Sequence, residues 1–153
     1  MRPVPIVIGL AASVLFFLQP DLRGTEGTTK FDGNWSVTVE GKAYKNGDGT
    51  VAQPWIKNFT TTVKNGALHG EYGTRGKSAW FELTGNIGDD GTASLLVNEL
   101  TGDRKYNFTR SKKGPPGKSV SYSFQGSAHF EGKHGTGRST SDDRTRIFTF
   151  VKE

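Results

Sequence analysis

Residues 55–72 read WIKNFTTTVKNGALHGEY, and this stretch decides the fold class. Aromatic and β-branched side chains dominate residues 55–63, which suits the pleated surface of a strand. Asn65-Gly66 follows, and a two-residue type I′ turn needs positive φ at both central positions, which this pair adopts readily. Residues 67–73 then return as a second strand. The stretch therefore predicts a hairpin of two antiparallel strands.

The chain from residue 31 onward repeats this alternation of short strand-like runs and turns, with no helical period. Polar loops are expected at 41–54, 112–118 and 132–143. We predict an all-β domain, an antiparallel up-and-down β-barrel of about eight strands, because closure removes exposed strand edges. A β-sandwich is the alternative. The expected strands are residues 34–40, 55–63, 67–73, 78–87, 92–100, 104–111, 119–124, 127–132 and 144–152.

Period-2 alternation selects the side chains that should line the interior of this barrel, because successive residues of a strand face opposite sides. An interior of eight strands is just wide enough to be filled by side chains or to hold one small ligand. The residues in the inward phase are Trp35, Val37, Leu68, Tyr72, Phe81, Leu83, Leu95, Val97, Tyr106, Phe108, Val120, Tyr122, Phe124, Phe130, Phe148 and Phe150.

The first strand is introduced by FDGNWSVTVEG, residues 31–41, in which a turn dipeptide leads into Trp35. We expect Trp35 to be a core anchor that packs near the C-terminal strand, with Arg144 or Arg146 beside it. The alternative is that Trp35 forms one wall of a ligand pocket.

The N-terminus has the pattern of an export signal. Arg2 precedes the apolar run VPIVIGLAASVLFFL, which has the shape of a secretory signal peptide and is short for a membrane span. An uncleaved N-terminal anchor is the alternative. We therefore expect a signal peptide or anchor at 1–24, a linker at 25–30 and the barrel domain at 31–153. The expected location is periplasmic or secreted, with no stable membrane span after processing.

Residues for catalysis or metal binding are scarce. The chain has no cysteine, which excludes disulfides and thiolate chemistry. Its three histidines show no metal-binding spacing, and its paired acids, such as Asp89-Asp90, sit at turns. An enzyme would need His69, His129 and an acid to converge in one cleft. We therefore predict a protein that is not an enzyme, with no catalytic residues, no cofactor and no metal.

Basic residues concentrate between Arg104 and Lys118, with Tyr106 and Phe108 among them. Basic groups with stacking aromatics are typical of single-strand nucleic-acid binders. The two aromatics share one face of a predicted strand, which favours a place in the core and a solvated basic rim. The net charge of +5 is mild and does not by itself imply nucleic acid. We expect no nucleic-acid partner.

Gly33-x-Trp35 at the start of the first strand resembles the G-x-W opening of the lipocalins and their avidin-like (calycin) relatives. The resemblance implies a tryptophan that plugs one end of the barrel beneath an arginine from the last strand, here Arg144 or Arg146. The central Thr-Asp-Tyr motif of the lipocalins is missing, and no biotin-site residues of the avidins are present.

A second resemblance covers most of residues 31–153. The phrases FDGNWSVTV, VKNGALHGEYG, LTGNIGDDGTA, LTGDRKYNFT, GTGR and FTFVKE resemble a family of short exported bacterial proteins of unassigned activity. This resemblance implies the fold unit and export.

These observations predict an exported, monomeric, non-catalytic barrel that binds a small apolar or amphipathic ligand. The alternative is a protein-interaction module, such as a periplasmic inhibitor or envelope-associated domain, that acts through its polar loops. The unknown partner is thus a small molecule or a protein. The candidate residues for a ligand pocket or a barrel plug are Trp35, Tyr72, Phe81, Tyr106, Tyr122 and Arg146.

Overall fold

The computed structural model describes residues 28–45, 49, 51–100, 121–141 and 144–153. The expected signal segment at 1–24, the expected strand at 104–111 and the expected loop at 112–118 lie outside these residues, as do Tyr106, Phe108 and Val120. The described residues form only strands, turns and irregular segments.

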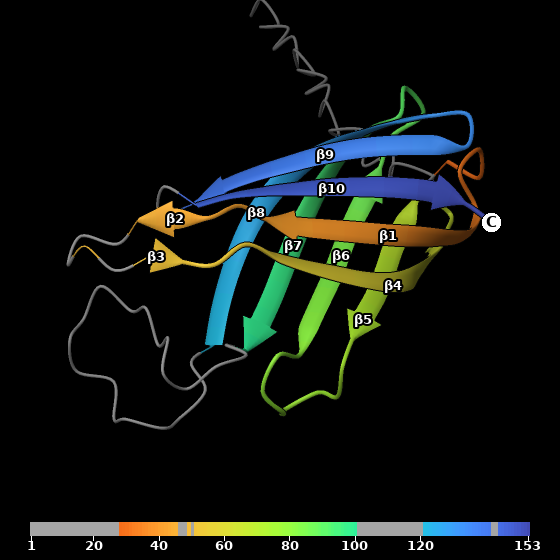
Figure 1. The fold of residues 1–153 in the computed structure, drawn as a ribbon. Coiled ribbons are helices and arrows are strands. Elements are labelled where there is room, and N and C mark those ends of the chain that lie inside the picture. The colour runs from red at the N-terminus through yellow and green to blue at the C-terminus, as the bar shows by residue number, and fades with distance from the viewer. Residues whose placement is uncertain (1–27, 46–48, 50, 101–120, 142–143) are drawn as a thin grey trace, which may run out of the picture.

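Ten strands follow one another along the described chain (Figure 1). Eight of them close into an antiparallel barrel in the order β1-β10-β9-β8-β7-β6-β5-β4, in which neighbours in space follow the chain order. The up-and-down barrel predicted from the sequence is therefore confirmed. The strands are β1 (Gly33–Gly41), β2 (Tyr44–Lys45), β3 (Val51–Ala52), β4 (Trp55–Lys64), β5 (Ala67–Tyr72), β6 (Phe81–Ile87), β7 (Thr92–Leu100), β8 (Ser121–Glu131), β9 (His134–Ser141) and β10 (Arg144–Lys152).

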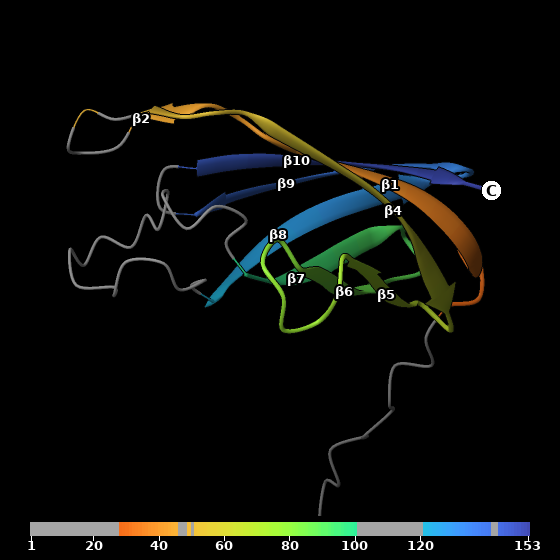
Figure 2. The same ribbon diagram turned by 60° about the horizontal axis from the view of Figure 1, so that its bottom comes forward.

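The barrel is flattened into two layers. In Figures 1 and 2, β9, β10, β1 and β4 run side by side and cross steeply over β5 to β8. β1 completes the closure because it pairs with β10 on one side and with β4 on the other. β2 and β3 pair with each other as a separate ribbon between β1 and β4, inside the segment 41–54 that was expected to be a loop.

The hairpin that led to the fold class forms as predicted. Asn65 and Gly66 have φ values of 51° and 75°, the two positive values that a type I′ turn requires. Strand β4 pairs with β5 directly across this turn, from Lys64 opposite Ala67. The Gly66 carbonyl also accepts a hydrogen bond of 2.8 Å from the Ile87 amide, which fixes the turn to the end of β6.

Two boundaries in the C-terminal half were predicted wrongly. Residues 121–131 form one continuous strand, where the sequence suggested two. Residues 134–141, expected within a polar loop, form β9. The inward glycine at 135 explains this strand: a Cβ there would lie 2.8 Å from the ring of Phe130, so only glycine lets that ring cross the strand.

A third boundary shifts at the start of β6. The strand begins at Phe81 instead of residue 78, and the residues before it form turns. Ala79 has a φ of 67° and Trp80 donates its amide hydrogen to the Lys77 carbonyl, so the chain turns immediately before it enters β6.

The inward phase is confirmed for the described part of the predicted lining. All of those side chains except two are buried; Tyr122 is half-buried, and Tyr72 is 36% exposed at the end of β5. Val39, Val63 and Ile87 also belong to the core. Thr28 of the expected linker is buried against the domain, and Phe31, the first residue of the expected barrel domain, is fully buried in the core cluster.

Trp35 is the anchor at the end of the barrel where the β4–β5, β6–β7 and β8–β9 turns lie, here called the plugged end. Its side chain is fully buried, its Nε1 donates a hydrogen bond of 2.9 Å to the Phe31 carbonyl, and its ring meets the Phe130 ring edge-on at 5.2 Å. Trp35 pairs with Lys152 of β10, so the predicted proximity to the C-terminal strand is confirmed.

The predicted arginine beside Trp35 is wrong. The cation over the Trp35 ring is Lys152, whose Nζ lies 5.8 Å from the ring centroid. Arg146 pairs with Gly41, six residues along β1 from Trp35, which is about 20 Å at the rise of a strand. Arg144 lies beyond Arg146 on β10, with its guanidinium over Tyr44. The register of β1 on β10 therefore places both arginines at the opposite end.

Candidate functional site at the barrel mouth

The opposite end of the barrel, here called the mouth, combines aromatic rings with inward-facing charged side chains, among them Lys57, Glu99 and Arg146. They come from β4, β7 and β10, and each lies in the inward phase of its strand, in line with buried neighbours. Ionised groups in a barrel interior are costly unless they are paired or bound. The mouth thus differs from the plugged end, where apolar rings and aliphatic side chains fill the space.

Strand register assembles one wall of the mouth. Tyr72 pairs with Phe81, Phe81 pairs with Glu99, and Glu99 pairs with Tyr122, so these four side chains form a row across β5, β6, β7 and β8. Directly opposite residues of antiparallel strands present their side chains on the same face. Three of the predicted site residues, Tyr72, Phe81 and Tyr122, therefore lie together.

Trp55 forms part of the facing wall. It pairs with Gly41, and a Cβ on that glycine would lie only 2.3 Å from the Trp55 ring, so the ring lies directly over the glycine. The Trp55 and Phe81 rings meet edge-on at 6.4 Å between centroids, and Phe59 meets Phe81 at 5.7 Å and Tyr72 at 6.5 Å. The two walls are thereby joined by aromatic contacts.

Lys57 lies among these rings. Its Nζ is 3.9 Å from the centroid of the Trp55 ring, 5.5 Å from that of Phe81 and 5.8 Å from that of Tyr72. These are cation–π distances. Burial lowers the pKa of the Lys57 ammonium; the charge of Glu99 acts in the opposite direction, and the charge of Arg146 lowers the pKa further.

Arg146, which is only 6% exposed, forms an ion pair with Glu99. Its Nη2 donates to a Glu99 carboxylate oxygen at 3.5 Å, and its Nη1 donates to the Ser141 hydroxyl at 3.2 Å. The guanidinium also stacks on Phe124, with Cζ 3.7 Å from the ring centroid. Arg146 is therefore held by an ion pair, a hydrogen bond and a ring face.

The sequence located part of this site. Tyr72, Phe81, Tyr122 and Arg146 lie at the mouth, Trp35 lies at the plugged end, and Tyr106 is outside the described residues. Sequence reasoning missed Lys57 and Glu99. The available signal was their phase: Lys57 alternates with Trp55 and Phe59, and Glu99 continues the inward positions of β7.

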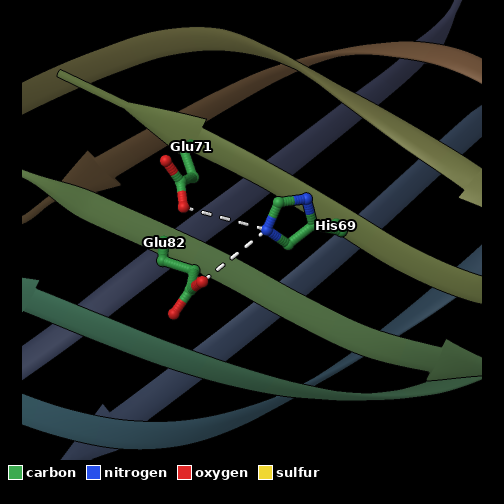
Figure 3. Close-up of side chains that lie close together, drawn as sticks. All are labelled: His69, Glu71 and Glu82. Atoms are coloured by element: carbon green, nitrogen blue, oxygen red, sulfur yellow. Dashed lines mark ion pairs between the residues drawn. The ribbon is translucent and has the colours of Figure 1, made fainter. Parts of the chain in front are cut away.

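A second cluster lies on the outer face of β5 and β6. Figure 3 shows the His69 ring pointing toward the carboxylates of Glu71 and Glu82, with Nε2 at 3.9 Å and 3.6 Å from their oxygens. A histidine and two carboxylates are metal ligands by type. Here Arg75 donates to both carboxylates, so a metal ion would have to displace this arginine.

The pKa values in this cluster follow from the same contacts. The hydrogen bond from Asn98 and the bonds from Arg75 lower the pKa of Glu82, and burial acts in the opposite direction. Glu71 and Glu82 raise the pKa of the Arg75 guanidinium. His69 and His129 do not converge, because β6 and β7 separate their strands, β5 and β8.

No family model, curated protein or solved structure matches the chain. The resemblances to the calycin barrels and to the exported bacterial family therefore gain no support from these comparisons. Within the described residues there is no helix that is long and apolar enough to cross a membrane.

Proposed function

We propose that this protein is a non-catalytic binder of one small apolar or amphipathic ligand, held at the barrel mouth. The observation that carries the proposal is the contrast between the two ends of the interior. Trp35 and Phe31 seal one end within the apolar core, whereas the other end holds Lys57, Glu99 and Arg146 between aromatic rings. Packing alone would not favour three ionisable groups inside a barrel.

The aromatic lining fits such a ligand. Trp55, Phe59, Tyr72 and Phe81 meet at angles between 61° and 68°, so they present both ring faces and ring edges. Small-molecule sites are typically lined by apolar and aromatic side chains with a few polar groups that fix the orientation of the ligand. The three charged side chains supply those polar groups.

Calorimetric and fluorescence titrations with the uncharged probe N-phenyl-1-naphthylamine test the proposal. We expect saturable binding of one probe per chain, and weakening of about tenfold or more for Trp55→Ala, which removes one wall. Ile56→Ala is the matched control, because Ile56 is the next residue of β4 and is 62% exposed on the outer face. Absence of saturable binding, or equal loss in both variants, would overturn the proposal.

Export is part of the same proposal and is supported by the basic start and apolar run of residues 1–18. Expression of the whole chain in a bacterium, followed by fractionation and mass measurement, tests it. We expect a shortened chain in the periplasm or medium. A full-length chain in the cytoplasm would contradict it.

A protein-interaction module is the second candidate, and the β2–β3 ribbon favours it. The ribbon continues the β1–β4 pair away from the barrel (Figure 2), and Val51 and Ile56 are 46% and 62% exposed on it and beside it. The double variant Val51→Ser/Ile56→Ser should abolish capture of a partner from envelope extract if the ribbon is the interface. Capture that persists in this variant would exclude the ribbon.

A further inference from the structure

Among the described residues, the charged side chains in the inward phase at the mouth are mostly basic. Lys57 and Arg146 bring two positive charges, and Glu99 brings one negative charge. Glu99 pairs with Arg146 at 3.5 Å, whereas no carboxylate of the described residues lies within 4.0 Å of the Lys57 ammonium. Among the described residues, the Lys57 ammonium therefore has no carboxylate at contact distance.

The surroundings of Lys57 compensate its charge only in part. Ring faces attract a cation weakly compared with a carboxylate at contact distance. Burial at the mouth also removes water from the ammonium, and this is the dominant reason that the pKa of Lys57 is lowered. An anion bound at this position would give the Lys57 ammonium a negatively charged partner and an acceptor for its three N–H donors.

We infer that the ligand is a small monoanion, a carboxylate on a flat apolar body, whose head group binds the Lys57 ammonium while its body packs against the neighbouring aromatic rings. The inference rests on the proposed function and deepens it. The single ammonium of Lys57 matches one negative charge, and an ammonium ligand would meet repulsion from both Lys57 and Arg146. The rings of Trp55, Phe59 and Phe81 supply the surface for the body.

The test uses three ligands that share one naphthalene skeleton: 2-naphthoate, naphthalen-2-ylmethanol and naphthalen-2-ylmethylammonium. Each is titrated by calorimetry into the whole chain near neutral pH. We expect the carboxylate to bind about tenfold or more tightly than the alcohol, since a hydrogen bond to a charged group is worth that much. We expect the ammonium to bind most weakly.

Two variants assign the preference to Lys57. Lys57→Met keeps an unbranched side chain without the charge, and it should reduce the carboxylate-to-alcohol preference to about one. Lys57→Arg should keep a preference for the carboxylate. Lys64→Met is the matched control, because Lys64 lies on the same strand and is exposed on the outer face.

The outcomes separate the two proposals. If none of the three ligands and no uncharged probe binds, the proposed function fails. If the alcohol or the ammonium binds as tightly as the carboxylate, or if Lys57→Met keeps the preference, the ligand is not recognised as an anion and this inference fails alone. Should Lys57→Met not fold, NMR of the Lys57 side chain replaces it: 2-naphthoate must raise the Lys57 pKa, and an unchanged value overturns the inference.

Discussion

Lys57 and Trp55 lie two positions apart on β4, and the Lys57 Nζ is 3.9 Å from the centroid of the Trp55 ring. The contact follows from the pleat of the strand, which points residues i and i+2 to the same face. It lies inside the barrel because Trp55 rests on Gly41 of the neighbouring strand. Local alternation and one glycine thus place a cation against a ring at the mouth.

The first prediction concerns the pH dependence of stability. Burial lowers the pKa of Lys57, so the unfolded chain holds this proton to higher pH than the folded chain does. The resulting penalty on stability is fully present below the lowered pKa and is relieved as pH rises from there toward 10.5. Lys57 faces Glu99, Arg146 and Tyr72, and these residues are the same in the wild type and in the Lys57→Met variant compared below.

Urea unfolding of the wild type and of Lys57→Met across this alkaline range measures the effect. We expect the wild type to gain stability relative to Lys57→Met as pH rises. A difference between wild type and Lys57→Met that does not change with pH would show that Lys57 is fully solvated in the folded state.

The second prediction concerns Gly41. In Gly41→Ala the added methyl group would sit 2.3 Å from the Trp55 ring, so the ring must move. We expect a loss of about 1–3 kcal/mol of unfolding free energy, as for other overpacked sites. In the Trp55→Leu background the same change should cost clearly less, because the clashing ring is gone. Equal costs in both backgrounds would mean that the ring does not lie on the glycine.

The third prediction compares two tryptophans. Trp35→Phe removes the hydrogen bond to the Phe31 carbonyl and leaves a gap in the fully buried plugged end. We expect a cost of about 1–3 kcal/mol. Trp55→Phe, at the half-buried mouth, should cost about 1 kcal/mol or less. Chemical unfolding of both variants measures these losses of unfolding free energy. A larger loss for Trp55→Phe than for Trp35→Phe would refute the assignment of Trp35 as the anchor.

The fourth prediction concerns the β4–β5 turn. Asn65 has a φ of 51°, a conformation that asparagine and glycine tolerate and that other side chains adopt at a cost. Asn65→Ala should lower the melting temperature, with a free-energy cost of about 1 kcal/mol, and Asn65→Gly should change it little. Thermal unfolding followed by circular dichroism provides the comparison. Equal melting temperatures of Asn65→Ala and Asn65→Gly would argue against a left-handed residue at this turn.

The sequence correctly predicted the features that depend on a short stretch of residues with one specific conformational requirement. Asn65-Gly66 predicted the hairpin because few other pairs adopt positive φ twice. Alternation predicted the inward phase of the described strands, including Phe148 and Phe150 of β10. Strand β9 was not predicted, because its inward positions are glycine and serine. The role of Gly135 among them depends on the Phe130 ring that lies over it.

The sequence by itself determined the all-β class, the up-and-down barrel, the phase of its strands and the burial of Trp35, since these depend on turn chemistry and period-2 alternation within short segments. Only the tertiary structure decided which cation meets which ring. The register of β1 on β10 places Lys152 over Trp35 and sends Arg146 to the mouth, where it pairs with Glu99 of β7. Register arises from all the strands closing together, so no single stretch of sequence specifies it.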